Sequence, residues 1–309
     1  MKNFFPLVVI LLFLSCEKSN DSHDFITAVE SELGVTATPS PLGGESVFFE
    51  SVAYGSAERQ QLDILLPAGD ASKGVLLFFH GGGFTAGDKS NAYDEFLLET
   101  MQTLLDNDIA IVSANYTLLT TTGNEGVLSA LEDGETALNY LRSKLNLLEI
   151  PTGKVVLAGV SAGAGIAQWN GFQTPNNNQV QGVLAIAAQS SYNLYEWENV
   201  FPGFSLDALR QLSTSLNDLF LQFYNGEPTA QELAAVEYRS FMDANDPPLY
   251  VFNIAGDQVV NAQGELDFDV LYHSYRHADY LRLQAINVGQ EFSGVFQESP
   301  DAFVLRVLE

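Results

Sequence analysis

Hydrophobic residues along this chain gather in short apolar runs, and segments with helical spacing separate the runs. Runs of this kind fill a sheet that is covered on both faces. Between two of them Val127, Leu131, Leu138, Leu141 and Leu145 recur at the spacing of one helix face. The predicted strands cover residues 47–54, 61–66, 75–79, 109–112, 155–157, 183–188 and 249–254.

This alternation of strands and helices predicts an α/β protein with a mostly parallel sheet and helices on both faces. The first two predicted strands flank a turn, so we expect them to join the sheet as an antiparallel pair. A length of 309 residues fits one large domain or a domain with a modest insertion, and 46% hydrophobic residues suffice for a sizeable core.

Residues 190–246 interrupt this rhythm, because they separate two strands by far more chain than one crossover needs. The stretches 206–223 and 229–242 have helical character, so we expect an inserted helical cap. The start of this segment is aromatic, with Tyr192, Tyr195, Trp197, Phe201 and Phe204.

The N-terminal residues have the pattern of an export signal. A short basic start precedes the apolar run Phe4–Leu14, which is too short to span a bilayer comfortably as a helix. The tract ending at Cys16 resembles a bacterial lipoprotein signal, in which the cysteine carries lipid and becomes the mature N-terminus. An ordinary signal peptide with a coincidental cysteine is the alternative.

The expected organisation follows from these boundaries. We expect a signal peptide over residues 1–15, a polar tether over 16–45 with a short helix near 25–33, and the main domain over 46–309. The resemblance implies a lipoprotein of the bacterial cell envelope that a lipid on Cys16 anchors to a membrane. Because Cys16 is the only cysteine, the chain forms no intrachain disulfide.

The charge balance is strongly acidic, with 13 lysines and arginines against 39 aspartates and glutamates and a formal net charge of -26. Nucleic acids and anionic membrane surfaces both require clustered positive charge, so we expect neither as a partner.

Ser161 is the candidate nucleophile. It lies in the tract Gly159–Gly163 (GVSAG), which follows a predicted strand and precedes a helix start. A G-x-S-x-G sequence in this setting forms a sharp turn that raises the serine Oγ above the edge of the sheet.

A glycine-rich tract, His80–Gly83 (HGGG), directly follows the strand predicted over residues 75–79. With this tract and the serine motif, the sequence from about Tyr54 to Gly289 resembles the bacterial carboxylesterases related to hormone-sensitive lipase. The resemblance implies an α/β-hydrolase fold, hydrolysis of a small-molecule ester, and no metal or organic cofactor. It also implies an oxyanion hole formed by the amides of Gly82, Gly83 and Ala162, with His80 as a structural residue.

The catalytic acid is expected after a later strand, because the order in this fold is serine, acid, histidine. Asp257 stands just past the strand predicted over residues 249–254, where the family has a comparable Gly-x-x-Asp tract. We therefore expect Asp257 to support the histidine.

The histidine departs from the family pattern. The loop after the last strand, around residues 291–296, contains none, and Gly294 stands where a histidine is expected. His273 and His277 instead fall in a helix predicted over residues 271–283, both on one side. Of the two, His273 is expected to lie closer to Ser161 and is our candidate base. The pair has too few ligands for a convincing metal site.

Two functions from different classes remain. The first is a carboxylesterase acting through an acyl-enzyme on Ser161, with modest activity because the expected histidine is absent. The second is a non-catalytic binding protein that has the pocket of this fold without its base.

Overall fold

The computed structural model describes residues 18–68, 71–260 and 265–309. The predicted signal peptide and Cys16 lie outside these residues. Within the described part of the chain, the structure contains no helix of the length and apolarity needed to cross a membrane.

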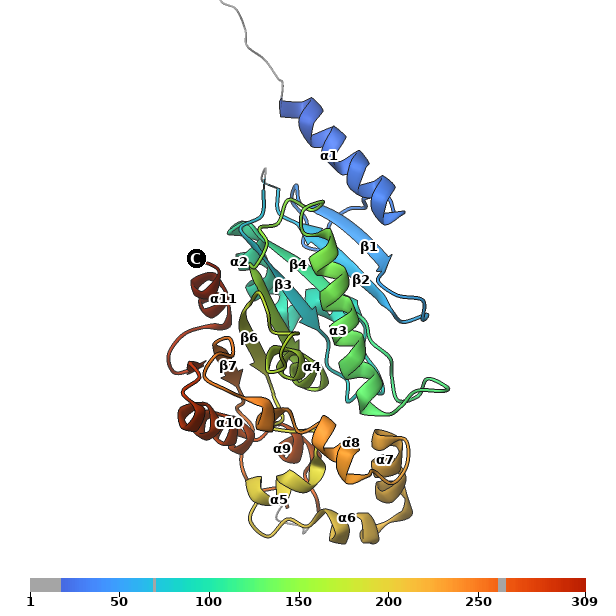
Figure 1. Cartoon of the computed structure of the whole chain (residues 1–309), viewed down its shortest axis with the longest axis vertical. Coiled ribbons are helices and arrows are strands. Elements are labelled where there is room, and N and C mark those ends of the chain that lie inside the picture. The colour runs from blue at the N-terminus through green and yellow to red at the C-terminus, as the bar shows by residue number, and fades with distance from the viewer. Residues whose placement is uncertain (1–17, 69–70, 261–264) are drawn as a thin grey trace, which may run out of the picture.

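An eight-stranded sheet forms the centre of the protein, in the order β1-β2-β4-β3-β5-β6-β7-β8 (Figure 1). β2 pairs antiparallel with both β1 and β4, and the other neighbouring pairs are parallel. The predicted mostly parallel sheet with an antiparallel first pair is therefore confirmed. The strands are β1 (Val47–Ala53), β2 (Gln61–Leu66), β3 (Gly74–Phe79), β4 (Ile109–Ala114), β5 (Val155–Val160), β6 (Val180–Ile186), β7 (Leu249–Phe252) and β8 (Phe292–Gly294).

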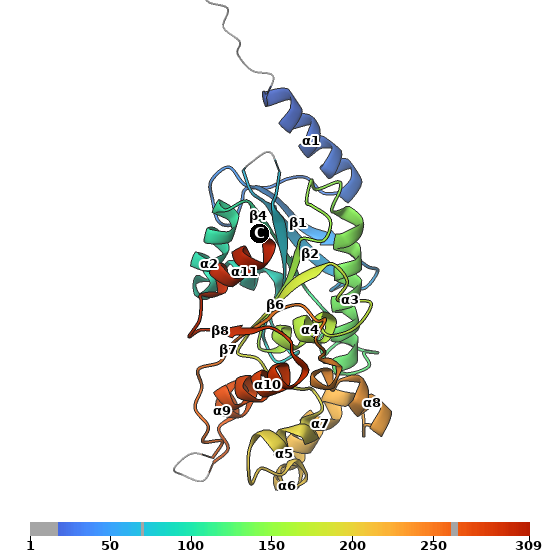
Figure 2. The same cartoon turned by 60° about the vertical axis from the view of Figure 1, so that its left-hand side comes forward.

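Helices cover both faces of the sheet and one of its ends (Figures 1 and 2). The α-helices are α1 (Lys18–Leu33), α2 (Glu95–Asp106), α3 (Val127–Lys144), α4 (Ala162–Gly171), α5 (Trp197–Val200), α6 (Leu206–Leu212), α7 (Thr214–Tyr224), α8 (Ala230–Ala235), α9 (Phe268–His273), α10 (Tyr275–Val288) and α11 (Pro300–Leu308). The short 3-10 helices of the described residues are η1 (Lys89–Tyr93), η2 (Leu194–Glu196) and η3 (Tyr238–Phe241).

The sheet separates two hydrophobic cores, because successive side chains of a strand point to opposite faces. In β3, Leu77 packs in the core shared with α3, α4 and α10, and the next residue, Phe78, packs in the core shared with α2 and α11. Both side chains are buried. This arrangement explains why the central strands read as continuous apolar runs.

The segment predicted as a cap, residues 190–246, contains η2, α5, α6, α7, α8 and η3. Helices α5–α8 gather at the end of the molecule opposite α1 (Figure 1). The predicted helix over 206–223 is two helices, because Ser213 has an extended backbone and its side chain accepts a hydrogen bond from the Leu216 amide. At the N-terminal side, α1 spans much more of the predicted tether than the short helix expected near residues 25–33.

Candidate active site

The carboxyl end of β5 runs directly into α4 through Ser161, whose backbone lies at φ 52 and ψ -116. A Cβ on Gly159 would lie 2.1 Å from the Gly163 carbonyl oxygen, and a Cβ on Gly163 would lie 2.1 Å from the Phe79 carbonyl oxygen. Both glycines are therefore required, because strand and helix approach too closely for any side chain. The turn holds Ser161 at the carboxyl end of β5. Its backbone conformation there costs free energy and is typical of a nucleophile elbow.

The glycine-rich tract follows β3 and turns beside the elbow. Gly82 has φ 114, and a Cβ there would lie 2.2 Å from the Ala86 carbonyl oxygen. The Gly82 carbonyl accepts hydrogen bonds from the amides of Thr85 and Ala86, which closes the turn. Among the described residues, Gly83 and Ala162 line the same cavity as Ser161, and Gly82 does not. The role of these three amides as oxyanion donors stays a prediction.

His80 is fully buried beside this turn. Its Nδ1 donates to the Gly81 carbonyl at 2.6 Å, and Nε2 accepts from Nη2 of Arg59 at 3.2 Å. Burial lowers the pKa of His80 to about 4, so the ring is neutral. The imidazole also stacks on the Tyr116 ring, with centroids 4.3 Å apart. These contacts fit a residue that holds the glycine-rich turn in place.

His273 contacts Ser161, the candidate nucleophile. Its Nε2 lies 2.9 Å from Ser161 Oγ, and its Nδ1 lies 2.7 Å from Asp269 Oδ1. A carboxylate only accepts, so Nδ1 carries the proton, and Nε2 is free to accept a hydrogen bond from the serine hydroxyl. The resulting order of hydroxyl, imidazole and carboxylate is that of a serine hydrolase triad.

Asp257, which was expected to support the histidine, is not the carboxylate that contacts His273. Its Oδ2 accepts hydrogen bonds from Arg276 at 2.7 Å and from Tyr275 at 3.2 Å, and Asp269 is the carboxylate against His273. Hydrogen bonds from Gln258 and Arg276 lower the pKa of the Asp257 carboxyl. The expectation fails because Arg276, at the start of α10, takes this carboxylate as its ion-pair partner.

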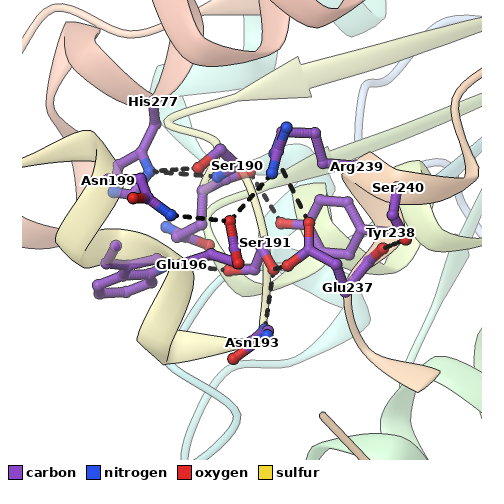
Figure 3. Close-up of polar contacts among 12 residues, drawn as sticks. Ser190, Ser191, Asn193, Glu196, Asn199, Glu237, Tyr238, Arg239, Ser240 and His277 are labelled. Carbon is purple, nitrogen blue, oxygen red and sulfur yellow. Dashed lines mark hydrogen bonds and ion pairs between the residues drawn. The ribbon is translucent and has the colours of Figure 1, made fainter. Parts of the chain in front are cut away.

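The predicted single helix around the two histidines is also wrong. Ser274, at φ -54 and ψ 144, separates α9 from α10 and caps α10 through the Arg276 amide. His273 consequently faces Ser161, whereas His277 is fully buried, with its Nδ1 accepting a hydrogen bond from Ser190 Oγ at 3.0 Å (Figure 3). Burial lowers the pKa of His277 to about 4, so this second histidine is neutral.

A cavity of about 310 Å³ opens onto Ser161. Most of its lining is apolar and comes from the predicted cap segment, residues 190–246. Of the aromatic residues at the start of that segment, Tyr192, Trp197 and Phe204 line the cavity. Phe201 is instead buried against the His277 ring, and Tyr195 packs against Phe220. The other apolar residues from this segment are Leu194, Leu206, Leu209, Leu216, Leu219, Phe220 and Phe223.

Comparison with protein families decides where the chain belongs. The family model described as BD-FAE matches residues 62–269. The chain belongs to the BD-FAE family. The match to this family includes the glycine-rich turn, Ser161 and Asp269, and it ends before His273. A search of the curated proteins found no match. The likeness to relatives of hormone-sensitive lipase stays a prediction from the two motifs.

Solved structures share the fold at low sequence identity. A truncated carbohydrate esterase from gut microbiota is 14% identical with a TM-score of 0.61, over 84% of this chain and 96% of that one. An inhibited esterase B from Lactobacillus rhamnosis is 13% identical with a TM-score of 0.61, over 94% of each chain. Esterase 2 of Thermogutta terrifontis is 17% identical with a TM-score of 0.53, over 85% of each. The fold is thus the α/β-hydrolase fold.

Asp269 is the candidate site residue that sequence reasoning missed in this BD-FAE family member. A signal for it was present, because Asp269 stands four residues before His273 and residues at this spacing are neighbours on a helix. The helix was expected to begin only at residue 271, which left Asp269 outside it. The earlier start of α9 is what brings the carboxylate to the imidazole.

Proposed function

We propose that this protein is a serine carboxylic ester hydrolase in which Ser161 is the nucleophile, His273 the general base and Asp269 the residue that orients the base. One observation carries the proposal. The Oγ of Ser161 lies within hydrogen-bond distance of an imidazole whose other nitrogen donates to a carboxylate. A hydroxyl becomes a useful nucleophile when an adjacent base accepts its proton and a third group orients that base.

The reaction proceeds through an acyl-enzyme. Ser161 Oγ attacks the ester carbonyl carbon as its proton passes to Nε2 of His273, and the carbonyl oxygen becomes an oxyanion. The C–O bond to the alcohol then breaks, and the alcohol leaves with the proton from Nε2. Water attacks the acyl-enzyme in the same way, which releases the acid and restores the Ser161 hydroxyl. As in the carboxylesterases with an HGGG motif, the amides of Gly82, Gly83 and Ala162 stabilise each oxyanion.

The apolar cavity supports a substrate whose acyl or alkoxy group is apolar. Arg210 lines the cavity, but it forms two hydrogen bonds with the Glu227 carboxylate, at 2.9 and 2.6 Å. Its guanidinium also lies 3.8 Å from the centre of the Phe220 ring. Because this charge is already paired, the cavity offers little to an anionic group. The esterases among the solved structures of this fold support ester hydrolysis in general.

The contact between Ser161 and His273 also favours catalysis over a purely binding role. The binding role was suggested only because the expected loop lacks a histidine that could act as the base. We further propose that the protein is an envelope lipoprotein, held to a membrane by lipid on Cys16. The apolar run that ends at this cysteine supports that location.

The proposal is tested by measuring ester hydrolysis with purified wild type, Ser161→Ala and His273→Ala. The substrates are p-nitrophenyl acetate, butyrate and octanoate. Exposed His23 offers a matched histidine control, His23→Ala. We expect Ser161→Ala and His273→Ala to lose at least about 1000-fold in turnover, as triad knockouts do, and His23→Ala to match wild type. We also expect butyrate and octanoate to be preferred over acetate. Wild-type turnover no faster than that of Ser161→Ala would overturn the proposal and favour the binding protein.

A further inference from the structure

The C-terminal end of α9 places His273, and its backbone carbonyls need donors from outside the helix. The last carbonyls of any α-helix have no amide of their own helix to bond. Here the Val270 carbonyl accepts from the Ser274 amide, which closes the final turn. The next carbonyls, of Leu271, Tyr272 and His273, point beyond the end of the helix.

Three side chains from other parts of the fold donate to these carbonyls. His277 Nε2 donates to the Leu271 carbonyl at 2.9 Å, and Gln189 Nε2 donates to the Tyr272 carbonyl at 2.8 Å. Asn253 Nδ2 donates to the carbonyls of His273 and Ser274, at 3.1 and 3.0 Å. Each successive carbonyl from Leu271 to Ser274 thus receives a side-chain hydrogen bond.

Each of the three donors is itself held in place by the sheet or by the chain that leaves it. Asn253 directly follows β7, and its side chain bonds both the amide and the carbonyl of Ala188, at 2.9 and 2.8 Å. Gln189 Nε2 also donates to the Ala187 carbonyl at 3.2 Å. His277 is fixed on its other side by Ser190, as Figure 3 shows. The helix end is therefore tied to the carboxyl ends of β6 and β7.

Helix α9 depends on such ties because it is only six residues long and a helix of that length is not stable by itself. Its outer side faces water, since the Asp269 side chain is 78% exposed. We propose that Gln189, Asn253 and His277 are positioning residues, which fix the end of α9 so that Nε2 of His273 stays within reach of Ser161. The expected effect on rate rests on the proposed esterase function.

Asn253→Ala tests this proposal, and Gln290→Ala is its matched control. Gln290 is also buried, and its amide donates to the Pro247 carbonyl at 2.8 Å, just before β7 begins and away from α9. We expect Asn253→Ala to lower kcat roughly 10- to 100-fold with KM within about two-fold of wild type, because a displacement of about 1 Å costs on that order. Gln290→Ala is expected to retain the wild-type kcat.

Two further variants separate hydrogen bonding from packing. Asn253→Asp has nearly the same shape and still accepts from the Ala188 amide, but it places a carboxylate against carbonyls that need a donor. It is expected to lose at least as much kcat as Asn253→Ala. Gln189→Met keeps the side-chain length and leaves Asn253 and His277 in place, so it provides a milder test if the Asn253 variants do not fold. We expect it to lower kcat several-fold.

Amide hydrogen exchange over residues 268–273, followed by mass spectrometry, gives a readout that does not require activity. Exchange there is expected to be at least ten-fold faster in Asn253→Ala and Gln189→Met than in wild type, and unchanged in Gln290→Ala. Unchanged exchange in a folded Asn253 or Gln189 variant would overturn the proposal, as would equal kcat losses in the control. If Ser161→Ala matched wild-type turnover, the esterase proposal alone would fail, and the exchange rates would still decide whether these residues hold α9.

Discussion

Asp269 lies one helical turn before His273 on α9, and its Oδ1 accepts a hydrogen bond from His273 Nδ1 at 2.7 Å. The proposed base and the acid that orients it therefore lie on the same short helix. The two side chains differ in their surroundings, because Asp269 is 78% exposed and His273 is 26% exposed. Water screens an exposed carboxylate, so this pair is expected to stabilise an imidazolium less than a buried pair does.

Asp269→Asn is expected to lower ester turnover by roughly 10- to 100-fold, whereas loss of a buried triad acid costs about 10,000-fold. The loss is smaller because water already supplies part of the stabilisation of the imidazolium. Steady-state hydrolysis of p-nitrophenyl butyrate measures it. Asp257→Asn is the matched control and is expected to stay within two-fold of wild type, since Asp257 pairs with Arg276. A larger loss in Asp257→Asn than in Asp269→Asn would reverse the assignment of the acid.

Gly163→Ala is expected to lower the free energy of unfolding by about 2 kcal/mol or more and to abolish labelling of Ser161 by a fluorophosphonate. The added Cβ would lie 2.1 Å from the Phe79 carbonyl oxygen and 2.6 Å from that of His80, and backbone atoms cannot move aside cheaply. Gly256→Ala is the control, because among the described residues, its two chain neighbours aside, no atom lies within 4 Å of its Cβ position. Urea unfolding and labelling measure both effects. Equal stability of the two variants would show that the elbow is not tightly packed.

Glu237 is expected to make the protein less stable as pH rises. Burial raises the pKa of Glu237 from 4.5 to about 7, although a hydrogen bond from Ser191 lowers it. Ser191 Oγ lies 2.5 Å from Oε2, and Arg239 Nε lies 3.6 Å from Oε1 (Figure 3). Between pH 4.5 and 7 the folded state holds a proton that the unfolded state releases, so the free energy of unfolding falls across this window.

Glu237→Gln mimics the protonated form and should remove this part of the pH dependence, so that the variant gains stability over wild type between pH 5 and pH 8. Urea unfolding of both proteins at these two values measures the gain. The difference between the proteins is the relevant quantity, because burial also raises the pKa of Asp246, to about 6. The same loss of stability from pH 5 to pH 8 in both proteins would rule out Glu237 as the source.

Cys16→Ser is expected to release the protein from the membrane fraction of an expressing bacterium, because the proposed lipid is attached through the thiol. Fractionation with immunoblotting shows where the protein is, and intact-mass spectrometry shows whether acyl chains are present. Ser15→Ala leaves the thiol in place and serves as the control. If the Cys16→Ser protein keeps the mass and membrane association of wild type, the protein is not a lipoprotein of this kind.

The two glycine motifs could be read from the sequence because each is a local requirement. Gly163 and Gly82 lie where a Cβ would collide with backbone atoms, so the chain must have glycine there to make these turns. The choice of the carboxylate that contacts His273 does not follow from a local requirement of this kind. Asp257 and Asp269 both stand in the connection after β7, and only the folded positions of Arg276 and His273 distinguish them.

The sequence by itself determined the sheet, because strands buried on both faces need continuous apolar runs. It also identified Ser161 as the candidate nucleophile, because the turn that holds this serine needs glycines at fixed positions. The tertiary structure alone decided how His273 reaches the serine. That contact requires a helix break at Ser274 and hydrogen bonds from Gln189 and Asn253, which come from distant parts of the chain. Periodicity reports which face of one element is buried. It does not report where a helix ends relative to a neighbouring strand, because contacts between residues far apart in the sequence set that position.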